Sequence, residues 1–526
     1  MKTKRKPSKG RRPKLAGRPA AVIDVGTTSI RMAVAELFDD GSVRILDTLT
    51  QAVTLGKDTF TTNSIAKGTI EDCVRVLKRY QHKLREYGVP PDRLRVVATS
   101  AVREATNRLA FLDRVYSATG IEIQPIDEAE VSRITYLGLQ PLVQAEPALA
   151  GARTIITEVG GGSMELLMLE AGNVIYSHSH RLGSLRLRET LDAYEAPRHK
   201  IRGMMENQIE RTVEQVVEHV PADGRIEMVA LGGDVRFAAS QLSPDWAAEP
   251  LGRLDLAALE RFTTRMLGKS EDELVRTYHL SFSDAETLGP ALLAYVQFAR
   301  AFKLEHLYVS NFNLRDGLLG EMARGGKWSE EFHAQIIRSA IDLGRKFDFD
   351  EAHGRHVAAL CRKLFHDLQE EHQLDARFEL VLYLAALLHE IGHFISYVSH
   401  HKHSMYLIQN SELFGLGKKD TLLVALAARY HRKSSPRAMH EGYANLDREQ
   451  RIAVSKMAAM LRVADALDRS HSQRIHDFTC VRERHRLVLS IPDVDDLSLE
   501  QVALRQKVAL FEEIFGMQVL LRRRAG

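Results

Sequence analysis

Cysteine is scarce in this sequence of 526 residues: Cys73, Cys361 and Cys480 lie far apart and form no recurring pattern. Three scattered thiols offer no disulfide framework, and such usage fits a reducing compartment, so we expect a cytoplasmic protein. No apolar run reaches about 18 residues, so no membrane span is expected. No apolar segment follows the N-terminal charges, so a secretory signal is not expected either.

The remaining composition is ordinary for a soluble protein, with 44% hydrophobic and 27% charged residues. A chain of this length is too long for one hydrophobic core, so three or four domains are expected.

The charge is unevenly distributed. Residues 1–18 carry nine Lys or Arg and no acid, so the rest of the chain carries −6 against the +3 of the whole. Such a basic segment with Pro and Gly predicts a disordered tail. Two readings remain open: a merely solvated tail, or one that contacts nucleic acid or polyphosphate electrostatically.

Hydrophobic periodicity predicts an α/β segment over 19–145, with an amphipathic helix at 70–88 and a buried strand at 93–100. Residues 100–120 read as helical. A second α/β segment is predicted over 146–325, with a long helix at 285–302, a strand at 306–310 and a loop at 311–319. Strand signals nearly vanish over 326–475, which predicts a helical domain. Residues 476–526 return to the order strand, strand, helix, strand and predict a small α/β domain.

A glycine turn with hydroxyls and an acid recurs in the two α/β segments. In "VIDVGTTSIRM" an apolar strand ends at an acid, and in "ITEVGGGSMEL" the same order returns; "LGGD" forms a third glycine turn. The residues concerned are Asp24, Gly26, Thr27, Thr28, Ser29, Glu158, Gly160, Gly161, Gly162, Ser163, Gly232 and Gly233. A plain hairpin turn and a ligand-facing turn both fit one such loop. Two similar halves that repeat it favour a cleft for a phosphate and a divalent cation.

These motifs, with "ATSAVREATN" and "LYVSNFNLRDGLL", together resemble the exopolyphosphatase / guanosine pentaphosphate phosphatase (Ppx/GppA) family over nearly the whole chain. The resemblance implies an α/β fold of tandem actin-like (ribonuclease H-like) domains. It also implies a homodimer that uses Mg²⁺ and direct attack by water to remove terminal phosphate from polyphosphate or guanosine pentaphosphate.

The resemblance also implies roles for particular residues. Arg103 matches the phosphate-binding arginine, Glu158 matches a metal-binding acid, and Glu165 is retained as a catalytic and metal-binding acid. The catalytic glutamate of the family falls on Val131 in this sequence. The preceding Glu130 is the candidate substitute, although neighbouring residues on a helix point about 100° apart.

Other positions depart from the family pattern. Glu158 replaces the usual Asp, Thr28 the usual Asn and Asp234 the usual Thr. Thr54 stands where an Arg is usual, with Lys57 nearby. Three functions therefore stay open: an active phosphatase, a catalytically impaired sensor that binds polyphosphate or guanosine polyphosphates, and a kinase of the actin-like superfamily.

The helical segment contains "LLHEIGHF", which fits the zinc-protease pattern H-E-x-x-H, although Gly392 weakens a continuous helix. It also resembles the HD phosphohydrolase fold. That resemblance implies a transition-metal site made of His353, His389, Glu390 and Asp465. Glu390 stands where Asp is usual, so an HD-like domain without metal remains a third reading.

Overall fold

The computed structural model describes residues 17–193, 198–220, 224–326, 328–432, 434–492 and 494–523. The chain divides into two compact units, one ending at Trp328 and the other beginning at Ser329. We call them unit 1 and unit 2 and describe each by itself.

The first half of unit 1 contains a five-stranded sheet in the order β3-β2-β1-β4-β5. The strands are β1 (Arg18–Val25), β2 (Ser29–Leu37), β3 (Val43–Ala52), β4 (Leu94–Ala98) and β5 (Gln124–Pro125). The first three strands form an antiparallel meander, while β4 runs parallel to β1 and β5 runs parallel to β4.

The second half contains a six-stranded sheet in the order β10-β11-β9-β6-β7-β8. The strands are β6 (Arg153–Val159), β7 (Met164–Glu170), β8 (Asn173–His180), β9 (Ile226–Leu231), β10 (Leu251–Asp255) and β11 (His306–Ser310). Here β6, β7 and β8 form the antiparallel meander, while β9 and β11 continue parallel to β6. The second sheet thus repeats the first and adds β10 at one edge.

The repeat extends to irregularities within the strands. Arg31 is the cross-strand partner of the acid on β1, and Glu165 is the partner of the acid on β6. The pairing with the next strand shifts three residues later in each half, after Val34 and after Met168. A bulge at one equivalent position in both halves supports a duplicated unit, because bulges bend and twist a strand locally.

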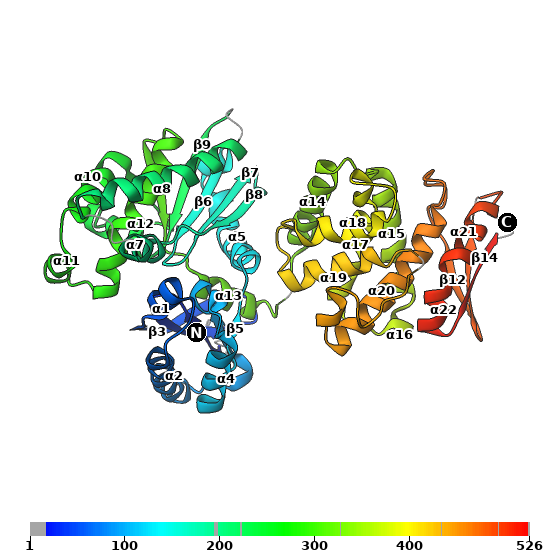
Figure 1. The fold of residues 1–526 in the computed structure, drawn as a ribbon, viewed down its shortest axis with the longest axis horizontal. Helices are drawn as coiled ribbons and strands as arrows, with labels where there is room; N and C mark the ends of the chain where they lie inside the picture. Colours follow the sequence, from blue (N-terminus) through cyan, green and yellow to red (C-terminus); the bar gives the residue numbers. More distant parts are fainter. Residues whose placement is uncertain are drawn as a thin grey trace, which may run out of the picture. The chain divides into compact units, whose positions relative to one another are not determined.

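Helices cover both sheets of unit 1 (Figure 1). They are α1 (Leu55–Thr62), α2 (Lys67–Glu86), η1 (Pro91–Arg93), α3 (Ser100–Glu104), α4 (Arg108–Thr119), α5 (Glu128–Ala145), α6 (Pro147–Ala150), α7 (Ser184–Ala193), α8 (Arg198–His219), α9 (Gly233–Leu242), α10 (Leu256–Leu267), α11 (Glu271–Tyr278), α12 (Phe282–Ala301) and α13 (Leu314–Ala323).

The predicted helical stretch 100–120 is interrupted between α3 and α4. The Asn107 side chain accepts a hydrogen bond from Ile65 N at 2.9 Å and donates one to Ile65 O at 2.9 Å. These two bonds tie Asn107, which precedes α4, to the backbone at Ile65, before α2.

The predicted loop 311–319 is wrong over most of its length. Residues 314–323 form helix α13, which packs against β1, β2 and α5 of the first half (Figure 1). Leu318 and Leu319 are fully buried there beside Ala20 and Val22 of β1. Because side chains alternate along a strand, one face of β1 is covered by α2 and α4, and the other needs α13.

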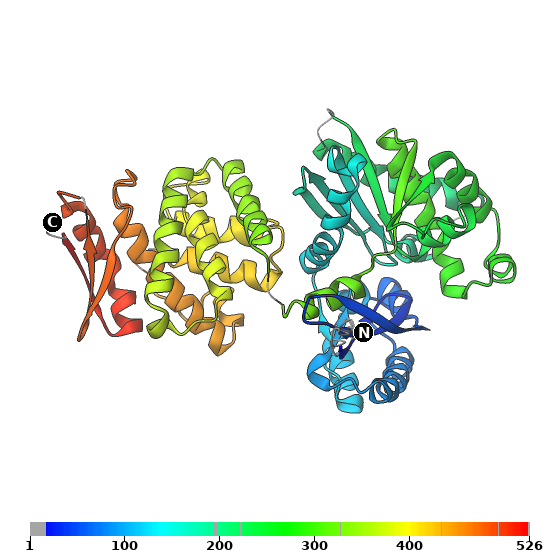
Figure 2. The same cartoon turned by 180° about the vertical axis from the view of Figure 1, so that it is seen from behind.

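Unit 2 begins with a helical part, as the sequence predicts, and ends with a three-stranded sheet in the order β12-β13-β14 (Figure 2). Its elements are α14 (Glu330–Lys346), α15 (Glu351–Asp367), α16 (Gln369–His372), α17 (Arg377–Leu388), η2 (Ile391–Phe394), α18 (His400–Gln409), α19 (Lys418–Arg429), η3 (Tyr443–Asn445), α20 (Arg448–Leu467), β12 (Thr479–Glu483), β13 (Arg486–Ile491), α21 (Ser498–Lys507), α22 (Ala509–Phe515) and β14 (Gln518–Arg523). Both α21 and α22 pack on α20, so residues 476–526 join the helical part in one unit.

Most of the predicted basic tail lies outside the described residues, which begin at Gly17. Its predicted end needs correction, because Arg18 is the first residue of β1 and pairs with Leu37. Among the described helices, none has the length and apolar composition needed to cross a membrane.

Candidate active site

A cavity of about 390 Å³ in unit 1 lies where β1 and β6 end and α9 begins. Its lining includes every residue predicted to bind phosphate: Asp24, Gly26, Thr27, Thr28, Ser29, Arg103, Gly160, Gly161, Gly162, Ser163, Gly232 and Gly233. The acids Glu158 and Glu165 also line it. Residues more than 200 positions apart in the sequence therefore meet around one space.

The two equivalent glycine turns have the same internal hydrogen bond. Gly26 N donates to Ser29 O at 3.0 Å, and Gly160 N donates to Ser163 O at 2.9 Å. Each turn joins two antiparallel strands, so each is a hairpin turn, and each also lines the cavity. The hairpin reading is therefore confirmed, and the ligand-facing reading stays a prediction that the place of both turns on the cavity wall supports.

In the first turn, the carbonyl oxygens are engaged by the segment that leads into α1. Thr28 O accepts a hydrogen bond from Val53 N at 2.9 Å, and Thr27 O accepts one from Gly56 N at 2.8 Å. These bonds fix the orientation of the peptide groups, since each carbonyl must face its donor.

The start of α7 does the same for the second turn. Gly160 O accepts from Ser184 N at 2.9 Å, and Gly161 O accepts from Arg186 N at 3.0 Å. The side chain of Arg186 donates from Nε to Gly162 O at 2.7 Å. Residues at the start of α7 thus donate hydrogen bonds to three successive carbonyl oxygens of the second turn.

The N–H groups in these turns remain available. Within the described part of the chain, no acceptor takes the N–H groups of Thr27, Thr28, Gly161 or Gly162. Buried N–H groups without an acceptor are rare in proteins, and groups of them bind anions. The paired turns therefore suit a ligand with several negatively charged oxygens.

The reason for glycine in the second turn is close packing rather than unusual backbone angles, because none of Gly160, Gly161 and Gly162 has a positive φ. A Cβ at Gly161 would lie 2.9 Å from Thr27 Cγ2 of the first turn. A Cβ at Gly162 would lie 2.3 Å from Ser100 Oγ. Glycine is needed here because the two turns meet without room for a side chain.

We predict that Gly162→Ala lowers the free energy of unfolding of unit 1 by about 1–3 kcal/mol, the usual cost of overpacking. The added methyl group would also lie 2.6 Å from Phe60 Cζ. Gly160→Ala is the matched control, since its nearest atom, Ser163 O, would be 3.4 Å away. Thermal denaturation of the two variants tests this, and equal melting temperatures would contradict it.

Asp24 faces the α13 side of the first sheet, and only 8% of it is exposed. Its Oδ2 lies 3.5 Å from Arg315 Nη1, while its Oδ1 is buried without a hydrogen-bond partner in the described structure. Burial raises the pKa of Asp24, although the Arg315 and Arg31 guanidinium groups pull it down. One oxygen of this carboxylate is therefore free to meet a cation.

As in Asp24, the two carboxylate oxygens of Glu165 differ in their contacts. Oε1 accepts hydrogen bonds from Ser163 Oγ at 2.9 Å and Ser179 Oγ at 2.8 Å. Oε2 is buried and has no hydrogen-bond partner among the described residues. Burial raises the pKa of Glu165 to about 7, against the lowering effect of the two serines.

Glu158 and Asp234 also line the cavity, and they bring to four the acids of its wall whose pKa is raised. Burial raises the pKa of Glu158, with Arg236 lowering it and Asp24 raising it further. Burial and the nearby Asp284 carboxylate raise the pKa of Asp234 to about 7. Four acids that resist ionisation in one cavity fit a site that takes up a cation.

Glu130, predicted as the substitute base, does not line the cavity. Its Oε1 lies 2.8 Å from Arg95 Nη2 and 3.7 Å from Arg133 Nη2, and both arginines also pair with Glu321 of α13. This network holds Glu130 away from the cavity, so the assignment of Glu130 as catalytic needs correction. The next residue, Val131, is the one that lines the cavity.

Arg103 lines the cavity from α3, as predicted. Its Nη1 donates to Ile126 O at 2.9 Å, and its Nη2 lies 3.0 Å from Glu128 Oε1. These contacts hold the guanidinium group at the cavity wall.

Sequence reasoning missed several polar residues of the lining, which are Arg31, Thr99, Ser100, Ser184, Asp284 and Thr287. Arg31 was detectable, since it alternates with Ser29 along a strand that begins at a predicted turn. Asp284 and Thr287 lie on α12, and nothing local marked them. Tyr295, also of α12, donates to Leu231 O and accepts from Val159 N at 2.8 Å, which braces the strand ends beside the cavity.

The histidine motif of unit 2 does not form one continuous helix. Helix α17 ends at Leu388, and residues 391–394 form the 3₁₀ helix η2. A Cβ at Gly392 would lie 2.1 Å from His400 O, so this turn is packed tightly. The zinc-protease reading is therefore wrong, because it requires both histidines on one helical face.

The other predicted metal residues of unit 2 do approach each other. Ligand atoms of His353, His389 and Glu390 all lie within 4.8 Å of one another. Asp465 Oδ1 lies 4.0 Å from His389 Nε2, but Lys507 of α21 forms an ion pair with Asp465 Oδ2. Three of the four predicted metal ligands, His353, His389 and Glu390, therefore lie close together. The fourth, Asp465, is paired with Lys507.

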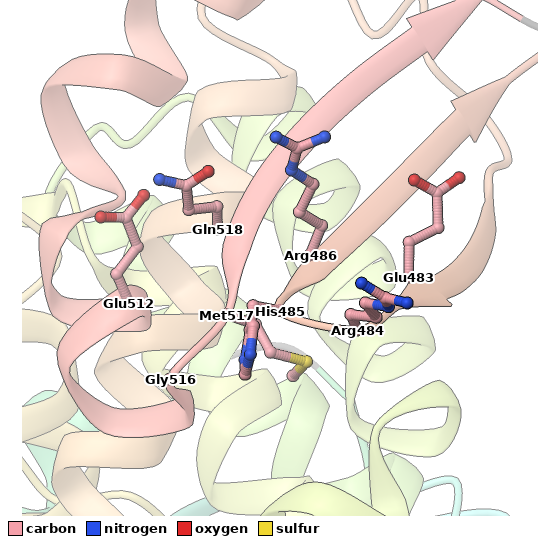
Figure 3. A pocket seen from close by; sticks show the side chains of 8 residues that line it. All are labelled: Glu483, Arg484, His485, Arg486, Glu512, Gly516, Met517 and Gln518. Carbon is pink, nitrogen blue, oxygen red and sulfur yellow. The ribbon is translucent and has the colours of Figure 1, made fainter.

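A second hollow, of about 710 Å³, lies at the end of the C-terminal sheet. Its labelled side chains, among them Glu483, Arg486 and Glu512, point in different directions rather than toward one another (Figure 3). Ligand sites need convergent polar groups, so this hollow is a weaker candidate than the cavity of unit 1.

Comparisons with known proteins agree on one family. The profile of the Ppx/GppA phosphatase family matches residues 33–325, and that of Ppx/GppA phosphatase domain III matches residues 337–508. A guanosine-5'-triphosphate,3'-diphosphate pyrophosphatase from Photobacterium profundum is 22% identical over 501 residues, which cover 92% of this chain and 95% of that protein.

Solved structures resemble the fold. An exopolyphosphatase from Cytophaga hutchinsonii has a TM-score of 0.53 at 20% identity, covering 59% of this chain and 98% of its own. An exopolyphosphatase-like protein has a TM-score of 0.52 at 21% identity, with coverages of 59% and 98%. These likenesses, which cover 59% of this chain, confirm the predicted α/β fold of its two similar halves. The helical domain predicted to follow them is present in unit 2. With matching profiles in both units, the chain belongs to the Ppx/GppA phosphatase family.

Proposed function

We propose that the protein releases terminal phosphate from inorganic polyphosphate or guanosine pentaphosphate by attack of water on the terminal phosphoanhydride. The observation that carries this proposal is the pair of equivalent turns, with N–H groups that no acceptor takes in the described structure, on the wall of one cavity with four acids whose pKa is raised. Phosphate chains present many charged oxygens, which such N–H groups bind in preference to neutral ligands.

In this proposal, backbone N–H groups bind the phosphate oxygens and a side chain adds positive charge beside them. The N–H groups of Thr27, Thr28, Gly161 and Gly162 would hold the oxygens of the last two phosphates. Arg103, fixed by Ile126 O and Glu128, would contribute a positive charge at the cavity wall. Such groups accelerate phosphoryl transfer mainly by positioning the anhydride and stabilising the charge that develops on it.

The acids of the cavity fit Mg²⁺, which the family implies. Asp24 Oδ1 and Glu165 Oε2 are buried carboxylate oxygens that have no partner in the described structure, and Glu158 and Asp234 lie on the same wall. Oxygen donors of this kind are the ligands that Mg²⁺ prefers. When bound, Mg²⁺ would neutralise phosphate oxygens as a Lewis acid.

In this protein the attacking water lacks the general base that the family resemblance implies. The family position for the water-orienting glutamate is Val131, which lines the cavity but cannot accept a proton. A general base typically contributes about 10²–10⁴-fold to a rate. We therefore propose a slow hydrolase in which Glu165 orients the water without a dedicated base beside it.

Val131 also supports a second candidate function, a sensor that binds polyphosphate or guanosine polyphosphates and does not turn them over. Binding requires the turns, Arg103 and the acids, all of which line the cavity. Only catalysis requires a base. The kinase reading receives no support from any feature of the cavity that the hydrolase reading does not explain.

Phosphate release from long-chain polyphosphate, guanosine pentaphosphate and ATP, each with and without Mg²⁺, tests the proposal. We expect Mg²⁺-dependent release from at least one of the first two substrates, and loss of release after chelation. Asp24→Asn is the matched negative control, because it removes charge without changing size. Tight binding without release would favour the sensor, and neither binding nor release would overturn both functions. The homodimer and the cytoplasmic location stay predictions.

A further inference from the structure

An exposed apolar segment of unit 2 takes no part in the cavity of unit 1. Residues 394–398, which we call the apolar loop, begin at the last residue of η2 and end shortly before α18. Phe394 is 59% exposed, Ile395 49%, Tyr397 78% and Val398 77%. Single exposed apolar side chains are ordinary, but a contiguous group of them marks an interaction surface.

Hydrogen bonds hold the backbone of the apolar loop in place. Ile395 N and Ser396 N both donate to Gly392 O, at 3.1 Å and 3.2 Å, and Val398 N donates to Ser396 Oγ at 3.1 Å. Gly392 N in turn donates to Ser404 Oγ of α18 at 2.9 Å. The outward position of the apolar side chains is therefore fixed by bonds to η2 and α18.

Neighbouring rings support the two aromatic side chains of the loop. The centroid of the Tyr397 ring lies 4.8 Å from that of His393, and the centroid of the Phe394 ring lies 5.4 Å from that of Phe347. Each contact covers part of a ring and leaves more than half of the residue exposed. Aromatic rings with one covered and one open side suit the boundary between an apolar phase and water.

Two exposed cations, Lys402 of α18 and Arg432 after α19, lie near each other, because these two helices pack side by side (Figure 1). Burial lowers the pKa of His401 to about 4, and the charges of Arg432 and Lys402 lower it further. Neither cation forms an ion pair with a carboxylate in the described part of the chain. Both are therefore available to an anionic surface.

The cations adjoin the apolar loop through two histidines. His400 Nδ1 lies 3.2 Å from Tyr397 O of the loop, and the centroids of the His400 and His393 rings are 4.1 Å apart. Burial and the His393 ring lower the pKa of His400 to about 4, and the charge of Arg432 lowers it further. Apolar and basic side chains therefore lie next to each other on unit 2.

This combination favours a lipid bilayer over a protein partner. Tyr397 and Val398 are more than three-quarters exposed, so the loop protrudes, and a fluid bilayer accepts a protrusion without a matching groove. Apolar and aromatic side chains enter the boundary between headgroups and acyl chains, while Lys and Arg are attracted by anionic lipids. The loop and the two cations provide both kinds of contact.

We propose that unit 2 binds the surface of an anionic lipid bilayer, with the apolar loop entering the interface and Lys402 and Arg432 contacting the headgroups. The contact is peripheral, because none of the described helices has the length and apolar composition needed to cross a membrane. The proposal does not depend on the reaction proposed for unit 1, since no residue of the loop lines that cavity.

Cosedimentation of the full-length protein with vesicles tests this contact. The vesicles contain either phosphatidylcholine alone or phosphatidylcholine mixed with phosphatidylglycerol. We expect binding to the mixed vesicles and much weaker binding to phosphatidylcholine alone, because only the mixed vesicles attract the cations. The double variant Tyr397→Ser, Val398→Ser should bind mixed vesicles about tenfold or more weakly, since it removes apolar surface. Arg432→Gln should bind about fivefold more weakly and respond less to added salt.

The double variant Leu109→Ser, Tyr116→Ser is the matched control, because it removes one aliphatic and one tyrosine side chain that are 75% and 58% exposed on α4 of unit 1. It should bind mixed vesicles as the wild type does. Binding that survives in the loop variant would place the contact elsewhere, such as on the basic residues 1–18, and overturn the proposal. A wild type that binds no vesicles would also overturn it. If the loop variant then changes the oligomeric mass, the loop contacts a second copy of the chain instead.

Discussion

Val131→Glu should raise the rate of phosphate release by about 10²–10⁴-fold, the contribution of one general base. Val131 lines the same cavity as the glycine turns. The resemblance to the family implies a water-orienting glutamate at this position. The substituted carboxylate would accept the proton of the attacking water, which the valine side chain cannot do. The measurement is the initial rate of phosphate release from polyphosphate and from guanosine pentaphosphate at saturating Mg²⁺.

Two further variants test whether a faster rate in Val131→Glu comes from the added carboxylate acting as a base. Val131→Gln has nearly the same shape as the glutamate variant without the charge and should not raise the rate. Glu130→Gln should leave the rate nearly unchanged, because Glu130 is held by Arg95 and Arg133 outside the cavity. If Val131→Glu folds, binds polyphosphate and releases no more phosphate than the wild type, our placement of the missing base is wrong.

Glu165→Gln should lower kcat by about 10²–10³-fold while KM for polyphosphate changes little. The substitution keeps the hydrogen bonds from Ser163 and Ser179 possible but removes the charge from the buried Oε2. That charge is expected to act on the cation and the water, which matter most as the anhydride breaks. Arg103→Ala is the contrasting variant and should mainly raise KM. A Glu165→Gln protein with full turnover would remove this residue from the mechanism.

The pH profile provides a second readout of Glu165. Its pKa is raised to about 7, so the carboxylate is present above that pH and is protonated as the pH falls through it. We expect wild-type phosphate release to fall as the pH drops below about 7, and Glu165→Gln to lose that dependence. Since the pKa of Asp234 is also raised to about 7, Asp234→Asn tests which acid is responsible. A profile lost in Asp234→Asn and kept in Glu165→Gln would assign the titration to Asp234.

The sequence by itself determined the parts of the site that are local. An apolar strand, an acid and a glycine turn follow one another within about ten residues, and the second copy repeats them. Residues this close in the chain are held together by one hairpin, so the repeated pattern alone places Asp24 and Glu158 at equivalent strand ends. The helical character of the segment after residue 328 was equally local, because it depends on periodicity within single helices.

Only the tertiary structure decided which neighbouring residue faces the cavity. Glu130 and Val131 are adjacent on α5, and their sequence order does not say which points inward. The arginines Arg95 and Arg133, together with Glu321 of α13, hold Glu130 on the far side. Arg133 and Glu321 are 188 positions apart in the chain, so no local pattern contains the answer.

Long-range packing also explains why Gly162 must be glycine and which side chains approach Glu390 in unit 2. Gly162 is glycine because Ser100 and Phe60 of the first half press against it, a contact that exists only once the two halves meet. His400 joins Glu390 because α18 packs across η2, which spacing in the sequence does not show. Hydrogen bonds and ion pairs between distant segments form only when hydrophobic burial has brought those segments together.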